Sequence, residues 1–218
     1  MPVIQVQVNS PSALASLSAN TNPSVLGGRA AELIVAELHS PLYTAAYNGF
    51  VNWVTTATGG TTIPVQAASL ASTFTVWNPL GSGKNLELIG YSAAFVTATT
   101  VVSDVSLYFQ TGVGGTSVAV PTNLTALTIR NGLLGGGIAS VASAYSVATL
   151  VGAIVKGPTL FAPTTTQSVA GGSTGPSLFN YQFRGEIIVP PGTLVTTAGN
   201  AAQSSAATQT LYWAEWPI

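Results

Sequence analysis

The fold class follows from residues 73–96, TFTVWNPLGSGKNLELIGYSAAFV. Residues 73–77 alternate as the residues of a β-strand do, and the Asn-Pro pair and the glycines that follow predict a turn. In the next predicted strand Leu86 and Leu88 lie on one face, whereas Tyr91 and Phe95 lie on the other. A change of phase beside a glycine indicates a β-bulge.

Short alternating segments recur on both sides of this stretch, at 105–109, 127–130, 183–189, 194–197 and 208–216. Turn residues separate them, and at most one or two helical patterns are present. No repeat of fixed period is found, which disfavours propellers and solenoids. We therefore predict an all-β protein, an antiparallel β-sandwich of jelly-roll-like type with an extended N-terminal arm.

The arm is predicted over residues 1–40 and the sandwich domain over residues 41–218. In the arm, Ile4, Val6 and Val8 alternate with glutamines, which predicts a short strand with one apolar face. The residues that follow are rich in Ser, Ala, Asn and Pro and offer little to a core. Residues 29–39 fit a helix and a strand equally well. We expect the first strand to pair with a neighbouring subunit by strand addition, through Val3, Ile4, Val6 and Val8.

The last predicted strand, Thr208 to Trp216, carries apolar side chains on both faces. Leu211 and Trp213 lie on one face, and Tyr212 and Trp216 lie on the other. A sandwich body covers only one face of a strand, and a large exposed apolar patch is rare on an isolated protein. We therefore predict a tightly assembled homo-oligomer, a trimer, with this strand near the contact. The expected contact residues are Tyr212, Trp213 and Trp216.

The chain is unusually poor in charge. Five Lys or Arg and six Asp or Glu make 11 charged residues among 218, with a formal net charge of −1, where an ordinary domain of this length carries about 55. Scattered cations cannot follow a phosphate backbone, so no nucleic-acid partner is expected. The absence of Cys excludes disulfides, thiol catalysis and Cys-ligated zinc. Ser, Thr and Gly take the place of charge, and such a surface suits either permanent contacts or a free domain covered by hydroxyl groups.

Catalytic groups are almost missing. His39 is the single histidine and Asp104 the single aspartate, so a Ser-His-Asp triad would need both. Residues 171–175 match G-x-S-x-G, but three threonines precede them and a proline follows, which is typical of a loop and not of a nucleophile elbow. Glu32 and Glu37 are spaced for opposite faces of a strand. We predict no enzyme activity, no catalytic residue, no cofactor and no metal site.

Two further patterns receive structural interpretations. Residues 81–84, Gly-Ser-Gly-Lys, lack the first glycine of a phosphate-binding loop and are predicted to be a turn. The uncharged window 131–155 is interrupted by serines and a glycine, and its longest apolar run is marginal for a bilayer, so no membrane span is expected. No cationic leader segment precedes an apolar run near Met1.

Aromatic residues are the remaining candidates for a ligand site. They can stack on sugars as in a lectin, or they can fill the core and a subunit interface, where Trp and Tyr are enriched. The second interpretation is favoured. The residues concerned are Trp53, Trp77, Trp213, Trp216, Tyr43, Tyr47, Tyr91 and Tyr212.

Three stretches together resemble small structural virion proteins of tailed double-stranded DNA phages: residues 37–49 (ELHSPLYTAAYNG), 77–86 (WNPLGSGKNL) and 213–218 (WAEWPI). The resemblance implies a capsid decoration (cement) protein with a β-sandwich body. Such a protein would sit as a trimer on the capsid surface of the virion, bound to the major capsid protein, and its arm would pair with a neighbour or with the shell. The alternative is a tail or spike protein that binds a host receptor or carbohydrate. No catalytic residue is carried over.

Overall fold

The computed structural model describes residues 42–65, 71–72, 74–96, 104–110, 121–150, 154–162, 178–201 and 206–218. The described part of the chain belongs to one unit, Leu42–Ile218. The predictions for the arm, including Val3, Ile4, Val6 and Val8, and for residues 29–39 lie outside the described residues.

The described residues form one short helix and fourteen strands. They are α1 (Tyr43–Tyr47), β1 (Val51–Thr55), β2 (Thr61–Thr62), β3 (Ala71–Ser72), β4 (Thr75–Asn78), β5 (Lys84–Phe95), β6 (Val105–Gln110), β7 (Thr122–Ala126), β8 (Ile129–Asn131), β9 (Ser143–Thr149), β10 (Val155–Phe161), β11 (Leu178–Gln182), β12 (Ile188–Val189), β13 (Thr193–Gly199) and β14 (Ala206–Pro217). Among them no helix is long and apolar enough to cross a membrane.

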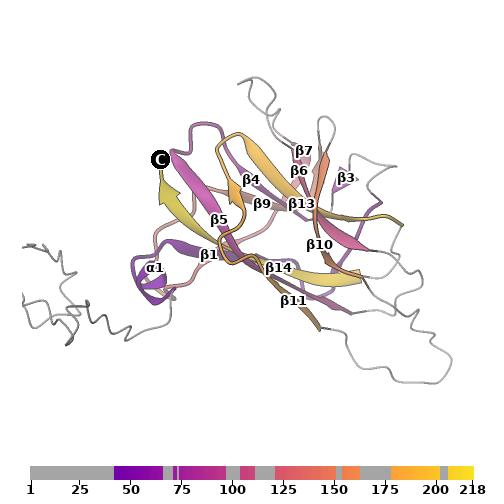
Figure 1. Ribbon diagram of the computed structural model, residues 1–218, viewed down its shortest axis with the longest axis horizontal. Coiled ribbons are helices and arrows are strands. Elements are labelled where there is room, and N and C mark those ends of the chain that lie inside the picture. Colours follow the sequence, from indigo (N-terminus) through magenta and orange to yellow (C-terminus); the bar gives the residue numbers. More distant parts are fainter. Residues whose placement is uncertain are drawn as a thin grey trace, which may run out of the picture. The chain divides into compact units, whose positions relative to one another are not determined.

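The strands form two antiparallel sheets packed as a sandwich (Figure 1). The β14 sheet has the order β11-β5-β14-β1-β8, with β12 on β5 and β2 on β14. The β13 sheet has the order β10-β6-β13-β4-β9-β3, with β7 on β9. Eight strands pair in a nested way, β1 with β14, β4 with β13, β5 with β11 and β6 with β10. This nesting places β1-β14-β5-β11 in one sheet and β4-β13-β6-β10 in the other, as in a jelly roll. The predicted fold class is confirmed.

The core lies between the two sheets and is built from the alternating inward positions of both. On β14 these positions include Leu211 and Trp213, which are both fully buried. Other large members include Val54, Ile63, Phe74, Val76, Leu86, Leu88, Tyr91, Phe95, Leu107, Phe161, Phe183 and Val195.

The predicted bulge is present in β5. Tyr212 pairs with Gly90, but the next residue, Trp213, pairs with Leu88, so Ile89 is the extra residue of the β5 strand. Because one residue is inserted, Leu88 and Tyr91 both point into the core although they are three apart in sequence. The bulge therefore resolves the change of phase seen in the sequence.

The turn at residues 79–83 carries the chain from the β13 sheet to the β14 sheet. The Asn78 side chain is buried there and donates through Nδ2 to the carbonyls of Lys84 and Val189, each at 2.9 Å. Gly81 and Gly83 have φ angles of +85° and +68°, which glycine adopts at little cost. The Gly-Ser-Gly-Lys stretch is thus an arch between sheets, and the predicted turn is confirmed.

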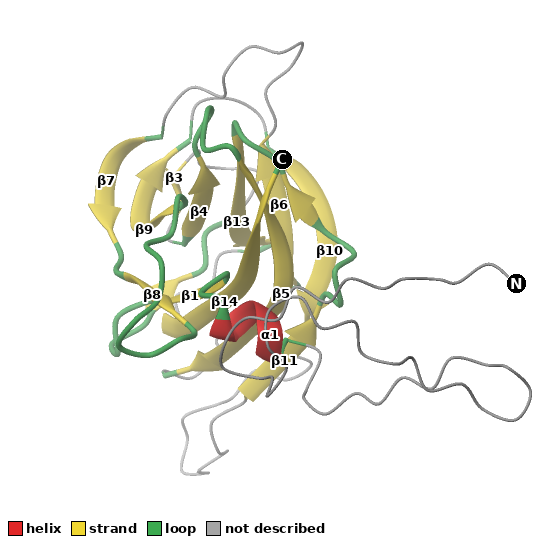
Figure 2. Cartoon of the chain, turned by 90° about the vertical axis from the view of Figure 1, so that its left-hand side faces the viewer, coloured by secondary structure: helices red, strands yellow, loops and turns green. Residues whose placement is uncertain are grey.

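Strands β7, β8 and β9 form an insertion between β6 and β10. β8 extends the β14 sheet beyond β1, and β9 extends the β13 sheet beyond β4. The segment that joins them, residues 132–142, crosses between the sheets on the side of the sandwich opposite β10 (Figure 2). This segment supports the site described next.

Candidate interaction surface on the outer face of the β14 sheet

A row of side chains crosses the outer face of the β14 sheet. The register places Arg130 of β8 beside Trp53 of β1, Trp53 beside Tyr212 of β14, and Tyr212 beside Gly90 of β5. Gln182 of β11 pairs with Gly90 and completes the row, and its side-chain amide nitrogen lies 3.1 Å from the place that a Cβ at Gly90 would take. The row therefore holds two aromatic rings between a guanidinium group and an amide.

Trp216 lies on the same face, nearer the C-terminus. Its ring meets Phe50 edge-on with the centroids 5.2 Å apart, and its indole N–H donates to Glu87 Oε2 at 2.6 Å. Tyr212 and Trp216 remain 38% and 37% exposed, so described residues cover neither of them completely. We call Trp53, Tyr212, Trp216 and Phe50 the aromatic face.

Trp213 was predicted to lie at the same contact, but its side chain points the other way. It is 0% exposed and belongs to the core between the sheets. The sequence led us to expect that both faces of β14 are covered. The core covers the inner face, and the outer face remains partly exposed. Of the three C-terminal residues expected at a contact, Tyr212 and Trp216 offer side chains at the surface and Trp213 does not.

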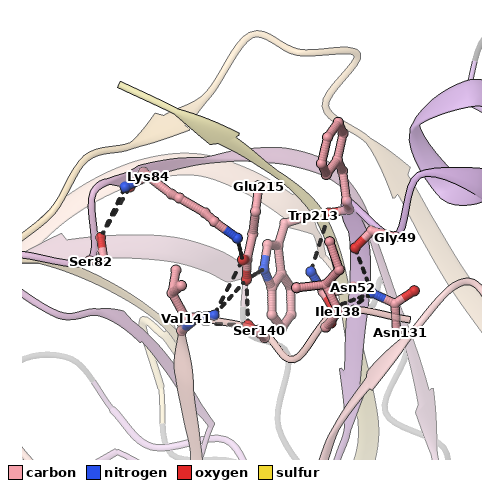
Figure 3. A network of polar contacts seen from close by, with 12 residues as sticks. Gly49, Asn52, Ser82, Lys84, Asn131, Ile138, Ser140, Val141, Trp213 and Glu215 are labelled. Carbon is pink, nitrogen blue, oxygen red and sulfur yellow. Dashed lines mark hydrogen bonds and ion pairs between the residues drawn. The ribbon is translucent and has the colours of Figure 1, made fainter. Parts of the chain in front are cut away.

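The side of β14 opposite the aromatic face holds a buried carboxylate (Figure 3). Glu215, on the inner side of β14, is 1% exposed and forms a salt bridge of 3.1 Å with Lys84 Nζ. It also accepts hydrogen bonds from the Ser140 hydroxyl, from the Val141 backbone N–H and from the Trp213 indole N–H. A buried charge is stable only when paired and hydrogen-bonded, and this one has four donors from three parts of the chain.

Asn131 ends β8 and holds residues 132–142, here called the inserted segment, against the start of β1 (Figure 3). Its Nδ2 donates to the Gly49 carbonyl at 2.7 Å and to the Ile138 carbonyl at 3.1 Å. Its Oδ1 accepts from the Leu133 N–H at 2.8 Å. Gly137 packs so closely that a Cβ there would lie 2.0 Å from the Asn131 side chain. The inserted segment is therefore clasped at two points, Asn131 and Glu215.

Residues of the second and third stretches quoted in the sequence analysis, 77–86 and 213–218, meet at this end of the sandwich, and Phe50, which follows the first stretch, joins them. Lys84, in the second stretch, is the ion-pair partner of Glu215, in the third. The Phe50 carbonyl, next to the first stretch, accepts the Glu215 N–H at 2.9 Å, and the Phe50 ring contacts Trp216. Residues separated by more than 100 positions thus form one structural unit.

The remaining aromatic candidates divide between core and surface. Tyr91 is fully buried and donates through its hydroxyl to Gln209, and burial raises the pKa of this hydroxyl. Trp77 is partly buried in a small apolar cluster on the outside of the β13 sheet, with Tyr145 and Leu194. Tyr43 and Tyr47 stack on each other in α1 with their ring centroids 6.1 Å apart.

The structure pairs the one aspartate with a cation. Asp104 accepts hydrogen bonds from Lys156 and from the Ser106 hydroxyl, and it exchanges backbone–side-chain bonds with Asn200. The Lys156 ammonium lowers the pKa of this carboxyl. Among the described residues no group of three or more His, Cys, Asp or Glu side chains is placed to hold a metal ion. His39, Glu32, Glu37 and residues 171–175 lie outside the described residues.

Comparisons of the chain with protein-family models, with curated proteins and with solved structures found no match.

The sequence did not single out Glu215, Arg130, Gln182 or Asn131. Each needs partners from distant strands, and no local pattern announces such partners. One signal was available for Glu215, because it follows Trp213 by two residues in an alternating strand. In such a strand the two side chains share a face, so a core tryptophan predicts a buried glutamate.

Proposed function

We propose that the chain is a non-enzymatic structural virion protein, a capsid decoration (cement) protein that stabilises a phage head by clamping neighbouring capsid subunits. The observation that carries the proposal is the aromatic face, which stands on one sheet of a jelly roll and has few charges beside it. Lys84 and Glu215, from two of the stretches that resemble phage virion proteins, form an ion pair on the inner side of this sheet, and this adds support.

The physical argument is one of desolvation. Tyr212 and Trp216 are each more than one-third exposed, and Ile188 beside Glu87 is 49% exposed. Covering these side chains removes apolar area from water at about 25 cal/mol per Å². Few ions must be dehydrated at the same time, because Arg130 and Glu87 are the charges closest to the rings in the register. Aromatic side chains with few charges are typical of the centre of a protein–protein contact.

The partners follow from the same proposal. The chain would form a homotrimer on the capsid surface of the virion and bind the major capsid protein, without nucleic acid, membrane or cofactor. A clamp must resist deformation, and the buried network of Glu215, Lys84 and Ser140 ties β14, β5 and the inserted segment together directly below the contact.

A cryo-electron microscopy map of the parent particle tests the proposal. We expect this chain on the outside of the capsid, with Tyr212 and Trp216 within 4 Å of another subunit. A map that places the chain at the tail tip would contradict the cement function, even if its fold is the one described.

A second candidate is a tail or spike protein that binds a host carbohydrate. The row from Arg130 through Trp53 and Tyr212 to Gln182 favours it, since sugar sites combine aromatic rings with amide or charged groups. Glycan-array binding of the full chain, lost in Tyr212→Ala and kept in Val155→Ala on the remote strand β10, would support this candidate. No glycan bound by the wild-type chain would remove it.

A further inference from the structure

Strand β11 (Leu178–Gln182) is an open edge of the β14 sheet. Within the described part of the chain it pairs on one side only, with β5, in a regular antiparallel register. Phe183, just after β11, donates its N–H to Ile89 on β5 at 2.9 Å. The hydrogen bonds of an antiparallel ladder involve every second residue, so the backbone N–H and C=O groups of Tyr181 and Phe179 also point toward β5. The backbone N–H and C=O groups of Leu178, Asn180 and Gln182 therefore point away from the sheet.

The edge strands β10, β7, β8 and β3 carry features that disfavour strand addition. β10 contains Lys156 and Pro158 and is irregular in register. β7 is irregular and includes Asn123 at a φ of +52°. β8 has three residues, one of them Arg130, and β3 has two. β11 has neither charge nor proline, and such an edge is a template for another strand.

The side chains of β11 are also incompletely covered. Leu178 is 72% exposed, and Phe179 and Tyr181 pack against the core while remaining only partly buried. The Phe179 ring stacks on Phe161 of the opposite sheet with the centroids 4.1 Å apart. One more strand beside β11 would cover these rings with its inward side chains and would satisfy the outward backbone groups.

We propose that the β11 edge binds residues 3–8 of a neighbouring copy of this chain. Their sequence, Val-Ile-Gln-Val-Gln-Val, alternates with the same period as β11. Ile4, Val6 and Val8 then extend the apolar layer of Phe179 and Tyr181, and the glutamines lie beside Asn180 and Gln182. No charge is present on either strand, so the pairing buries none.

The chain is long enough for this exchange. Residues 9–41 separate the strand from Leu42, and these 33 residues span up to about 110 Å when extended. That length exceeds the size of a domain such as the sandwich, so the strand can reach another subunit. This inference extends the proposed function by naming the segment and the edge that join copies. It does not depend on where in a particle the chain sits.

Disulfide trapping in the purified full-length chain tests the pairing, and the absence of native Cys makes it clean. Copies with Gln5→Cys or Gln7→Cys are mixed with copies that carry Asn180→Cys or Gln182→Cys. We expect disulfide-linked heterodimers several-fold above the amount formed with Thr58→Cys, an exposed residue of the turn after β1. Yields equal to this control, or links that form only within a single copy carrying both cysteines, would overturn the proposal.

A proline substitution gives an independent measurement. Asn180→Pro removes an outward N–H and leaves the bonds to β5 in place, whereas Asn180→Thr keeps the N–H. We expect the oligomer to dissociate at least tenfold more readily in Asn180→Pro than in Asn180→Thr, with β-sheet circular dichroism unchanged. Equal assembly of the two variants would contradict the pairing. If Asn180→Pro unfolds, the trapping experiment still decides. If the trapping and proline results are negative but the chain is found on a capsid, the pairing of residues 3–8 with β11 is rejected and the proposed cement function is not.

Discussion

At the scale of single residues, buried polar groups fix how the strands meet. Gln209 on β14 accepts hydrogen bonds from Tyr91 of its own sheet and from Thr197 of the β13 sheet. Glu215, six residues further on, collects four donors at the other end of the same strand. Each group is expensive to bury alone and is satisfied only in one arrangement. The two groups therefore define the alignment of the sheets at both ends of β14.

The first prediction concerns Glu215. Glu215→Ala leaves the Trp213 indole N–H, the Val141 N–H and the Lys84 ammonium without their acceptor. Breaking a buried pair in this way costs about 3–5 kcal/mol, and we expect urea unfolding to show a loss of that size. Glu186→Ala, at an exposed carboxylate, is the control and is expected to change stability by less than about 0.5 kcal/mol. Equal effects in the two variants would contradict the role of Glu215.

The second prediction compares two neighbouring glycines. A Cβ at Gly137 would lie 2.0 Å from Asn131, whereas one at Gly136 has no neighbour closer than 3.9 Å. Gly137→Ala should displace Asn131 and break its bonds to Gly49 and Ile138, at a cost of about 1–3 kcal/mol. Gly136→Ala should be neutral or slightly stabilising. Thermal unfolding measures both, and a neutral Gly137→Ala would show that the clasp is dispensable.

The third prediction concerns acid. The pKa of Asp104 is lowered in the folded state by Lys156, so the carboxylate contributes stability that is fully present above its ordinary pKa of 3.8. This contribution is lost as pH falls through the lowered value. Asp104→Asn should therefore be less stable than wild type at pH 7, and the difference should shrink as pH falls below 3.8 and through the lowered pKa. Urea titrations at several pH values measure this, and a difference independent of pH would contradict it.

At the scale of elements, local patterns predicted half of the described strands, and contacts over long sequence distances decided the rest. The bulge beside Gly90 was visible because β5 changes phase there. The segment 183–189 was predicted as one strand, but Arg184 has a φ of +52° and the chain turns at residues 184–185. Only Ile188 and Val189 resume pairing with β5. Alternation alone does not show such a turn, because Phe183 and Val189 both remain core residues.

The sequence predicted only part of the candidate surface, for a related reason. Alternation in the last strand separated Tyr212 and Trp216 from Trp213 correctly. Which of the two faces is the core depends on the opposite sheet, which a single strand does not reveal. Arg130 and Gln182 joined the surface only through the register of β8 and β11.

The fourth prediction tests the arch between β4 and β5. The Asn78 Nδ2 donates to the carbonyl of Lys84, at the start of β5, and to the carbonyl of Val189, in β12. Asn78→Ala removes this donor from both carbonyls, although the Lys84 carbonyl keeps a hydrogen bond from the Ser82 hydroxyl at 3.2 Å. A buried group that loses its partner costs about 1–3 kcal/mol, and we expect a loss of this size in urea unfolding, against little change for Asn85→Ala on the outer side of β5. A cost below that of the control would contradict the bridging role of Asn78.

At the scale of the whole molecule, exposure of the aromatic face argues for assembly. The core takes the inner side of β14, including Trp213, so the outer side must be covered by a partner or left in water. A permanent contact buries more than about 1,000 Å² in total, and a closed three-fold arrangement lets identical faces and identical arms meet identical neighbours.

The last prediction tests this contact with a charge. Tyr212→Lys places an ammonium group at the centre of the aromatic face, where it cannot be solvated in a contact. We expect native mass spectrometry to show a trimer for wild type, monomers for Tyr212→Lys and a trimer for Leu124→Lys on β7, with unfolding midpoints of the isolated subunits unchanged. Leu124 is 40% exposed and Tyr212 is 38% exposed, so we expect the two lysine substitutions to change the stability of the monomer equally little. Only a contact at the aromatic face would make Tyr212→Lys dissociate the trimer while Leu124→Lys does not. A wild-type chain that stays monomeric at micromolar concentration would contradict the assembly itself, whereas dissociation by both lysines would place the contact elsewhere.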